Sequence, residues 1–135
     1  MFVLIVTSSP KMIALAALPK GPAPLALTLL LAIKERCPGL GVDRLYPRSE
    51  PWMKLDVVQY QAIQRARLAS ARAVHLHPTQ LTAQVVAGVR AAGIEVHAWD
   101  VNDEDSLDLV TGLGIPRLCT DRFAQAYAYR ERRQP

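Results

Sequence analysis

The sequence predicts an α/β fold in which parallel strands are joined by helices. Short apolar, β-branched runs alternate with stretches whose apolar residues recur at helical spacing. The chain has 135 residues, of which 50% are hydrophobic, enough for one core of ordinary size and a single domain over residues 1–135. Strand and helix alternation demands parallel strands with helical crossovers. It does not decide between an open twisted sheet and a segment of a closed barrel.

The first third of the chain gives the weakest periodic signals. Residues 2–6 form an apolar run typical of a short buried strand. Residues 11–18 suit a short helix that Pro19 would end. Residues 25–31 indicate a second buried strand, and residues 37–52 show no clear period and predict an irregular segment.

The pattern becomes regular after Lys54. Apolar spacing predicts a helix over residues 55–70 and a strand over residues 73–76. A second helix is expected from Thr79, with Gly93 as its left-handed C-terminal cap, and residues 94–101 predict the next strand.

The last third predicts one more strand between two helices. Asn102 or Asp103 can cap a helix that ends by Gly114. Residues 115–119 indicate the last strand, and a final helix is expected to run to about residue 129.

Charge and cysteine content exclude several classes of function. The net charge of +4 depends partly on arginines in the last six residues, where a solvated helix end accounts for them, so we expect no nucleic-acid partner. Cys37 and Cys119 lack the spacing of a zinc site or a redox pair and fit a reducing cytoplasm. The apolar run over residues 25–33 is too short for a membrane span, which needs about 20 residues.

Residues 94–99 are predicted to place two kinds of side chain on opposite faces of a strand. Ile94, Val96 and Ala98 point to one face, and Glu95, His97 and Trp99 point to the other. The second face is unusually polar for a parallel sheet buried on both sides. A barrel interior accommodates such a face, and an edge strand would also tolerate it.

Other polar residues have an ordinary structural interpretation beside a functional one. His75 and His77 share a strand face, but no carboxylate stands at a helpful spacing, so we expect structural histidines and no metal ligands. Ser8 and Ser9 follow the first strand and could bind an anion or simply cap a helix. Asp121, which follows Thr120, is expected to cap a helix, and its alternative role is to face a ligand.

The second half of the chain resembles the C-terminal part of the glycerophosphodiester phosphodiesterases. The resemblance rests on Gly93 ending a helix, on Trp99-Asp100-Val101-Asn102 closing a strand, and on Thr120-Asp121 ending the last strand. The family's signature at the second place is Trp-Thr-Val-Asn, so Asp100 stands where the family has threonine. Residues 116–118 also depart from the family's Val-Asp-Gly-Ile type of sequence.

This resemblance implies the second half of a (β/α)8 barrel, since a whole barrel needs about 250 residues. The family hydrolyses glycerophosphodiesters in lipid and glycerol metabolism, using a divalent metal, Mg²⁺ or Ca²⁺, and a pair of histidines. Its His-Arg-Gly motif and metal ligands belong to the first half, and this sequence has no His-Arg pair, so no catalytic residue carries over. Residues 3–10 also resemble a mid-barrel strand of the family that ends in paired serines, here Ser8 and Ser9, so the substrate-binding residues that the resemblance implies are Trp99, Asn102 and Ser8.

Two functions follow as expectations. In the first, the chain is a half-barrel of a phosphodiesterase, inactive alone, that associates as a homodimer or with a complementary half because a half-barrel exposes strand edges. In the second, it is a non-catalytic module that binds a small phosphodiester or polyol, or serves as an assembly surface. An open doubly wound sheet is a further alternative for the fold.

Overall fold

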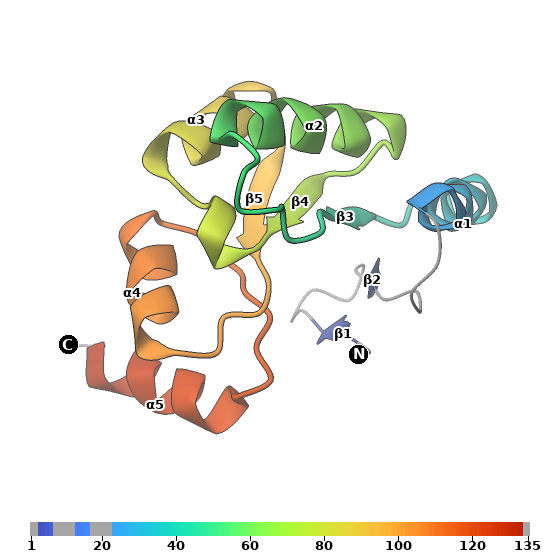
Figure 1. The fold of residues 1–135 in the computed structure, drawn as a ribbon. Helices are drawn as coiled ribbons and strands as arrows, with labels where there is room; N and C mark the ends of the chain where they lie inside the picture. The colour runs from blue at the N-terminus through green and yellow to red at the C-terminus, as the bar shows by residue number, and fades with distance from the viewer. Residues whose placement is uncertain (1–2, 7–12, 17–22, 134–135) are drawn as a thin grey trace.

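The computed structural model describes residues 3–6, 13–16 and 23–133 as an α/β arrangement (Figure 1). A two-stranded antiparallel sheet pairs β1 (Val3–Val6) with β2 (Ile13–Ala16). A second sheet is parallel and has the order β3-β4-β5. Its strands are β3 (Asp43–Leu45), β4 (Ala73–Leu76) and β5 (Glu95–Ala98). The helices are α1 (Ala23–Arg36), α2 (Leu55–Leu68), α3 (Ala83–Ala91), α4 (Glu104–Gly112) and α5 (Phe123–Arg133), with the 3-10 turn η1 (Pro78–Gln80).

One face of the parallel sheet forms the main core. Helices α2 and α3 cover it (Figure 1), and α4 and α5 extend the same core beyond the carboxyl end of β5. The core residues are Val74, Leu76, Val96 and Ala98 from the strands, Val58, Ala62 and Ala66 from α2, and Val85, Val86 and Val89 from α3. A fully buried valine or leucine contributes about 1.5–3 kcal/mol, so this face accounts for much of the stability.

The ends of two helices around this core agree with the sequence, but the helix predicted from Thr79 begins later, because residues 78–80 form the 3-10 turn η1 and α3 starts at Ala83. Thr82 caps α3 by accepting a hydrogen bond from the Val85 N–H at 3.2 Å. Asp103 caps α4 by accepting one from the Ser106 N–H at 2.7 Å. After α3, Gly93 takes a φ of 78°, which favours glycine because other residues meet steric strain there. The cap at Asp103 and the left-handed Gly93 confirm the predictions for these two helix ends, whereas the Thr82 cap was not predicted.

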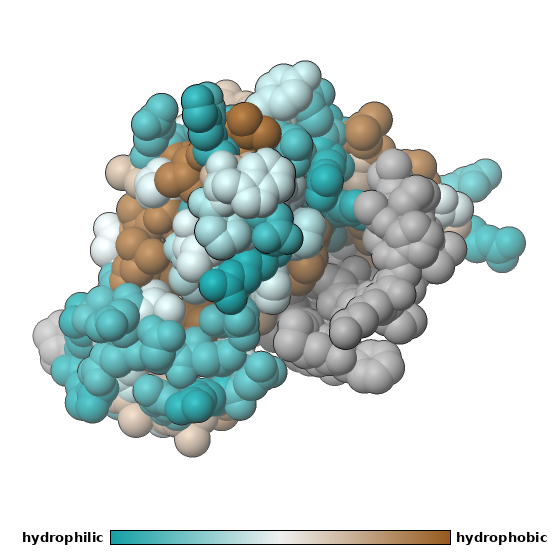
Figure 2. Space-filling model, in the orientation of Figure 1, coloured by the Kyte–Doolittle hydropathy of each residue, from teal (hydrophilic) through white to brown (hydrophobic). Residues whose placement is uncertain are grey.

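The arginines at the end of α5 lie on the surface and pair with acidic side chains. Arg132 contacts Glu104 at 2.8 Å, and Arg133 contacts Asp108. Figure 2 shows hydrophilic residues over the part of the surface formed by α4 and α5. The basic C-terminal segment is therefore partly neutralised by its own fold, as expected for a solvated helix end.

Two predictions for the first third of the chain are wrong. The run at residues 25–31 lies in α1, because it continues without a break to Arg36 and places two basic residues, Lys34 and Arg36, in the last turn. Residues 13–16, predicted as helix, form β2 because they pair in register with β1. Eight residues between prolines are too few to form a stable helix without tertiary support.

The segment at residues 37–52, predicted to be irregular, contains a short strand. Residues 43–45 form β3, which pairs with β4 so that Asp43 lies opposite Ala73 and Leu45 opposite His75. In the predicted last strand, Leu118 makes an isolated parallel bridge to Ala98, and no regular strand follows β5 in the described residues. Among these residues no helix is long and apolar enough to cross a bilayer.

Candidate functional site

The carboxyl ends of β4 and β5 carry the predicted site. His77 directly follows β4, and Trp99 directly follows β5. Ligand sites of parallel α/β folds lie at this end of the strands, where loops bring side chains from several strands together. The other predicted residue, Ser8, lies outside the described residues, as does Ser9.

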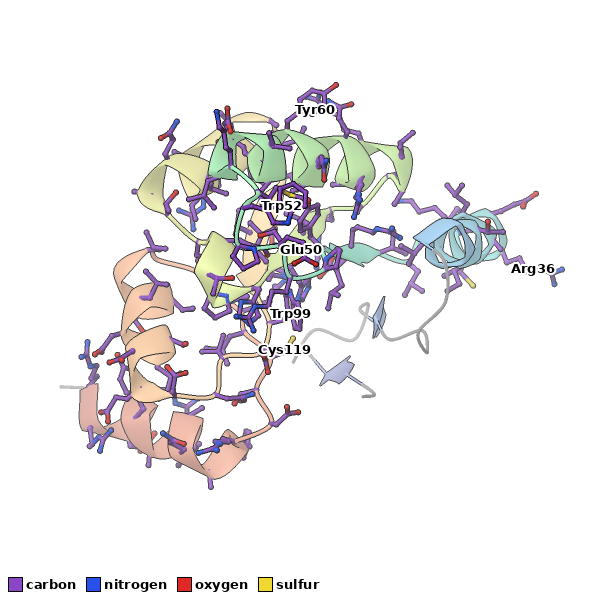
Figure 3. The ribbon with its side chains drawn as sticks, in the orientation of Figure 1. Arg36, Glu50, Trp52, Tyr60, Trp99 and Cys119 are labelled. Atoms are coloured by element: carbon purple, nitrogen blue, oxygen red, sulfur yellow. The ribbon has the colours of Figure 1, made fainter. Side chains whose placement is uncertain are left out.

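Trp99, labelled in Figure 3, contacts the residues that directly follow β3 and β4. Its indole N–H donates a hydrogen bond to the carbonyl of Tyr46 at 3.0 Å. Its ring meets the His77 ring edge-on, with centroids 5.1 Å apart. The side chain is half-buried, so part of the indole remains available to a ligand while the rest is fixed.

His77 supports the site by holding the carboxylate of Asp100. Its Nδ1 accepts a hydrogen bond from the Thr79 N–H at 3.2 Å, so the neutral ring carries its proton on Nε2, which lies 3.3 Å from Asp100 Oδ2. Burial lowers the pKa of His77, and the hydrogen bond to Asp100 only partly opposes this effect. The structural role predicted for His77 at a helix start is confirmed.

Asp100 itself occupies an unusual backbone conformation. Its φ is 61°, in the left-handed region that aspartate and asparagine enter more readily than other residues with a side chain. Its side chain is 37% exposed and accepts hydrogen bonds from both His77 and Asn102. The carboxylate is thus fixed from two sides and still faces solvent.

Asn102 uses its whole hydrogen-bonding capacity inside the turn. Its amide nitrogen donates to Asp100 Oδ1 at 2.7 Å and to Asp121 Oδ2 at 3.5 Å. Its carbonyl oxygen accepts from the Thr120 hydroxyl at 2.9 Å and from the Asp121 N–H at 2.8 Å. An asparagine side chain offers two donors and two lone pairs, so none is left for a substrate. In this structure Asn102 positions Asp100 and Asp121.

A second polar cluster, not predicted from the sequence, lies on the sheet face opposite the core. Asp43 from β3, His75 from β4 and His97 from β5 are all buried, and we call them the Asp-His-His cluster. The expectation that no carboxylate accompanies His75 is wrong, because Asp43 Oδ2 lies 3.1 Å from His75 Nε2. The polar face predicted for β5 was the one signal in the sequence that pointed to this cluster. The strand β3, which carries Asp43, was not predicted.

The electrostatics of the cluster favour an ionised carboxylate beside a neutral imidazole. Burial alone would raise the pKa of Asp43, but hydrogen bonds from His75 and His97 hold that pKa well below its usual range. Burial lowers the pKa of His75, and its hydrogen bond to Asp43 offsets only part of this. Burial, aided by the charge of Asp43, raises the pKa of the nearby Cys119 thiol to about 11.

The donor atoms of the Asp-His-His cluster do not suit the metals that the family resemblance implies. Mg²⁺ and Ca²⁺ bind through carboxylate, carbonyl and water oxygens. Here two of the three donors are imidazole nitrogens, which suit zinc, cobalt or nickel. The cluster can hold a metal ion, but it does not replace an oxygen-rich site for Mg²⁺ or Ca²⁺.

The comparison with known families agrees with this arrangement. A sequence profile of the glycerophosphoryl diester phosphodiesterase family matches residues 31–125. The chain belongs to this family. The match covers β3, β4, β5 and the Trp99 turn, so the predicted resemblance is confirmed. No curated protein sequence matches the chain.

Solved structures share the fold at low sequence identity. A protein from Agrobacterium tumefaciens assigned to the glycerophosphoryl diester phosphodiesterases has 21% identity and a TM-score of 0.56, covering 82% of this chain and 53% of its own. An Oleispira antarctica phosphodiesterase in complex with the product sn-glycerol-3-phosphate has 20% identity and a TM-score of 0.54, covering 73% and 38%.

A glycerophosphodiester phosphodiesterase from Parabacteroides distasonis has 15% identity and a TM-score of 0.53, covering 76% of this chain and 39% of its own. The chain therefore spans about half or less of the length of these relatives. Together with the parallel β3-β4-β5 unit and its helices, these likenesses confirm the predicted α/β fold related to a (β/α)8 barrel.

Proposed function

We propose that the chain forms the second half of a glycerophosphodiester phosphodiesterase barrel and supplies the wall that binds the alcohol or glycerol part of the substrate. The observation that carries this proposal is the position of Trp99, half-buried at the carboxyl end of β5 within a match to the family. An indole face packs against the carbon skeleton of a polyol, while fixed carboxylates accept hydrogen bonds from its hydroxyls.

The charge at this end of the sheet supports the assignment of the wall. Asp100 and Asp121 converge on Asn102 and give the turn two carboxylates. Carboxylates repel a phosphate anion but accept hydrogen bonds from hydroxyl groups. The phosphate is thus expected to lie away from this turn, toward groups that the other half of the barrel supplies.

The resemblance carries over none of the family's catalytic residues to this chain. The family resemblance implies a His-Arg-Gly motif and acidic metal ligands, and this sequence has no His-Arg pair. We therefore propose that the chain alone binds ligand without turnover and gains activity with a complementary half. The alternative is a module that only binds a ligand. The position of Trp99 supports it equally, and the two functions differ in whether a complementary half adds hydrolytic activity.

Fluorescence can test binding directly because the chain has two tryptophans. Trp52 is 77% exposed, and Trp52→Phe leaves Trp99 as the only indole (Figure 3). Titration of this variant with sn-glycerol 3-phosphate and with glycerol is expected to change the Trp99 emission in a saturable way. Asp100→Asn should weaken glycerol binding, whereas Glu131→Gln, on the surface of α5, should not. An unchanged emission at millimolar ligand would reject the site.

An activity assay distinguishes the two functions. The purified chain is incubated with glycerophosphocholine and Mg²⁺ or Ca²⁺, and glycerol 3-phosphate is measured. We expect no turnover. Turnover that disappears in chelator would show that the chain alone is an enzyme and would contradict the half-barrel proposal.

Association is the remaining part of the proposal. Among the described residues, β3 has no hydrogen-bonded strand on its other side in the β3-β4-β5 order, and such a strand edge favours pairing with another chain. We propose a homodimer or a complex with a complementary half, in the cytoplasm, where the free thiols of Cys37 and Cys119 remain reduced. Light scattering of the purified chain at micromolar concentration tests the homodimer, and a monomeric mass would contradict it.

A further inference from the structure

The parallel register gathers the Asp-His-His cluster from three different strands. His75 lies directly opposite His97, and Asp43 starts the strand on the other side of β4. The three residues are 3%, 1% and 0% exposed. Polar groups buried this deeply must satisfy one another or bind something that does.

The distances between the three facing atoms match those between the ligands of a tetrahedral metal ion. His75 Nε2 lies 3.1 Å from Asp43 Oδ2, His97 Nδ1 lies 3.2 Å from His75 Nε2, and His97 Nδ1 lies 3.3 Å from Asp43 Oδ2. Zinc binds nitrogen and oxygen at about 2.0–2.1 Å, which places tetrahedral ligand atoms about 3.3 Å apart. The triangle is already close to this size.

Each side chain of the cluster also contacts a further polar group outside the cluster. Glu95 Oε2 lies 3.1 Å from His97 Nε2, and Arg72 Nη2 lies 3.4 Å from the outer oxygen of Asp43. Cys119 Sγ lies 3.7 Å from His75 Nδ1. Partners of this kind orient metal-binding histidines and carboxylates, and they fix which ring nitrogen carries the proton.

The contact with Glu95 determines what His97 presents to the cluster. In the tautomer in which His97 donates its Nε2–H to Glu95 Oε2, 3.1 Å away, Nδ1 presents a lone pair to the cluster, as metal binding requires. A cation bound by the three facing atoms takes the place of the hydrogen bonds among them.

We propose that Asp43, His75 and His97 bind one borderline transition-metal ion, of the zinc, cobalt or nickel class, that joins β3, β4 and β5. Two imidazoles and one carboxylate are the donor set that these ions prefer, and a fourth position is left for water or another donor. This site is separate from the Trp99 wall and does not rest on the proposed phosphodiesterase function.

The test is a metal titration of the full 135-residue chain after chelator treatment. The protein carries Cys37→Ser and is kept in reductant, because exposed Cys37 could bind metal by itself. Calorimetry with Zn²⁺ should give one ion per chain, and Mg²⁺ should give no measurable heat. Co²⁺ should produce the intense visible absorption of a tetrahedral nitrogen and oxygen site.

Variants test whether the ion binds at the Asp-His-His cluster. Asp43→Asn and His97→Gln should lower Zn²⁺ affinity at least 100-fold, because each removes a ligand. His77→Gln is the matched control, since it changes the one other histidine of the chain and should leave the affinity within about twofold. Glu95→Ala should weaken binding by about 10–100-fold, as outer partners of metal ligands do, while Glu50→Ala should not.

Several results would overturn the proposal. The absence of Zn²⁺ binding to the folded chain would do so, since the cluster would then be a hydrogen-bonded network. Unchanged binding in Asp43→Asn, or loss of binding in His77→Gln, would place the ion elsewhere. If a buried variant fails to fold by circular dichroism, the exposed Glu95→Ala change and the Co²⁺ spectrum of the parent chain still decide the outcome.

Discussion

Replacing Asn102 with alanine tests the turn that holds the carboxylates beside Trp99. The change removes hydrogen bonds of 2.7, 2.9 and 2.8 Å, together with a weaker contact at 3.5 Å. A net hydrogen bond is worth about 0.5–1.5 kcal/mol, and these bonds lie partly at the surface, so values near the lower end apply. Their sum predicts a loss of about 2 kcal/mol in the free energy of unfolding.

Thermal unfolding followed by circular dichroism measures this loss. A domain of this size loses roughly 3–5 °C in Tm for each kcal/mol, so the Asn102→Ala variant should unfold about 6–10 °C lower. Gln125→Ala is the control, because it removes an exposed amide from α5, and its Tm should stay within about 2 °C of the parent.

The Asn102→Asp variant distinguishes the contribution of the amide oxygen of Asn102 from that of its amide nitrogen. The new carboxylate can still accept from the Thr120 hydroxyl and the Asp121 N–H, but it stands against the carboxylates of Asp100 and Asp121. We expect a loss at least as large as that of alanine, and a smaller loss in high salt, where like charges are screened. A Tm unchanged in both variants would refute the positioning role assigned to Asn102.

Further predictions concern the backbone and the core. Gly93→Ala should cost about 1 kcal/mol, because φ of 78° strains any side chain, whereas Gly112→Ala, in α4 with open space around it, should be neutral or stabilising. Urea unfolding should therefore show a loss of stability for Gly93→Ala and none for Gly112→Ala. Thr82→Ala should destabilise by about 1 kcal/mol through loss of the α3 cap, and Thr82→Ser should restore most of it in the same assay. Tyr46→Phe should cost about 1 kcal/mol, because the phenol donates to Gln61 Oε1 at 2.6 Å; an unchanged midpoint would contradict this bond.

The sequence predicted the regular part of the fold well because local signals and tertiary packing agree there. The strand at residues 73–76 has the predicted bounds, and α2 differs from its prediction only at its end. Both have clear apolar periods. The Trp99 turn was located by a family motif, and Asp103 was found by its capping chemistry.

The failures occur where the local sequence is ambiguous. A short apolar run such as residues 25–31 suits a buried strand or a helix, and only its continuation to Arg36 decides for α1. Strand β3 has three residues, two of them charged, and forms because β4 lies beside it. Without β3 in place, no local pattern joins Asp43 to His75, which lies 32 positions later, or to His97, a further 22 positions along the chain.

The left-handed conformation of Asp100 bears on how the family motif is inherited. The motif has a threonine at this place, and a β-branched residue is a steric outlier at a φ of 61°. Exchanging aspartate for threonine in this chain would therefore strain the turn instead of restoring an ancestral contact. Dihedral angle and residue type have to change together here, so a designer who transplants the family motif must transplant the loop geometry with it.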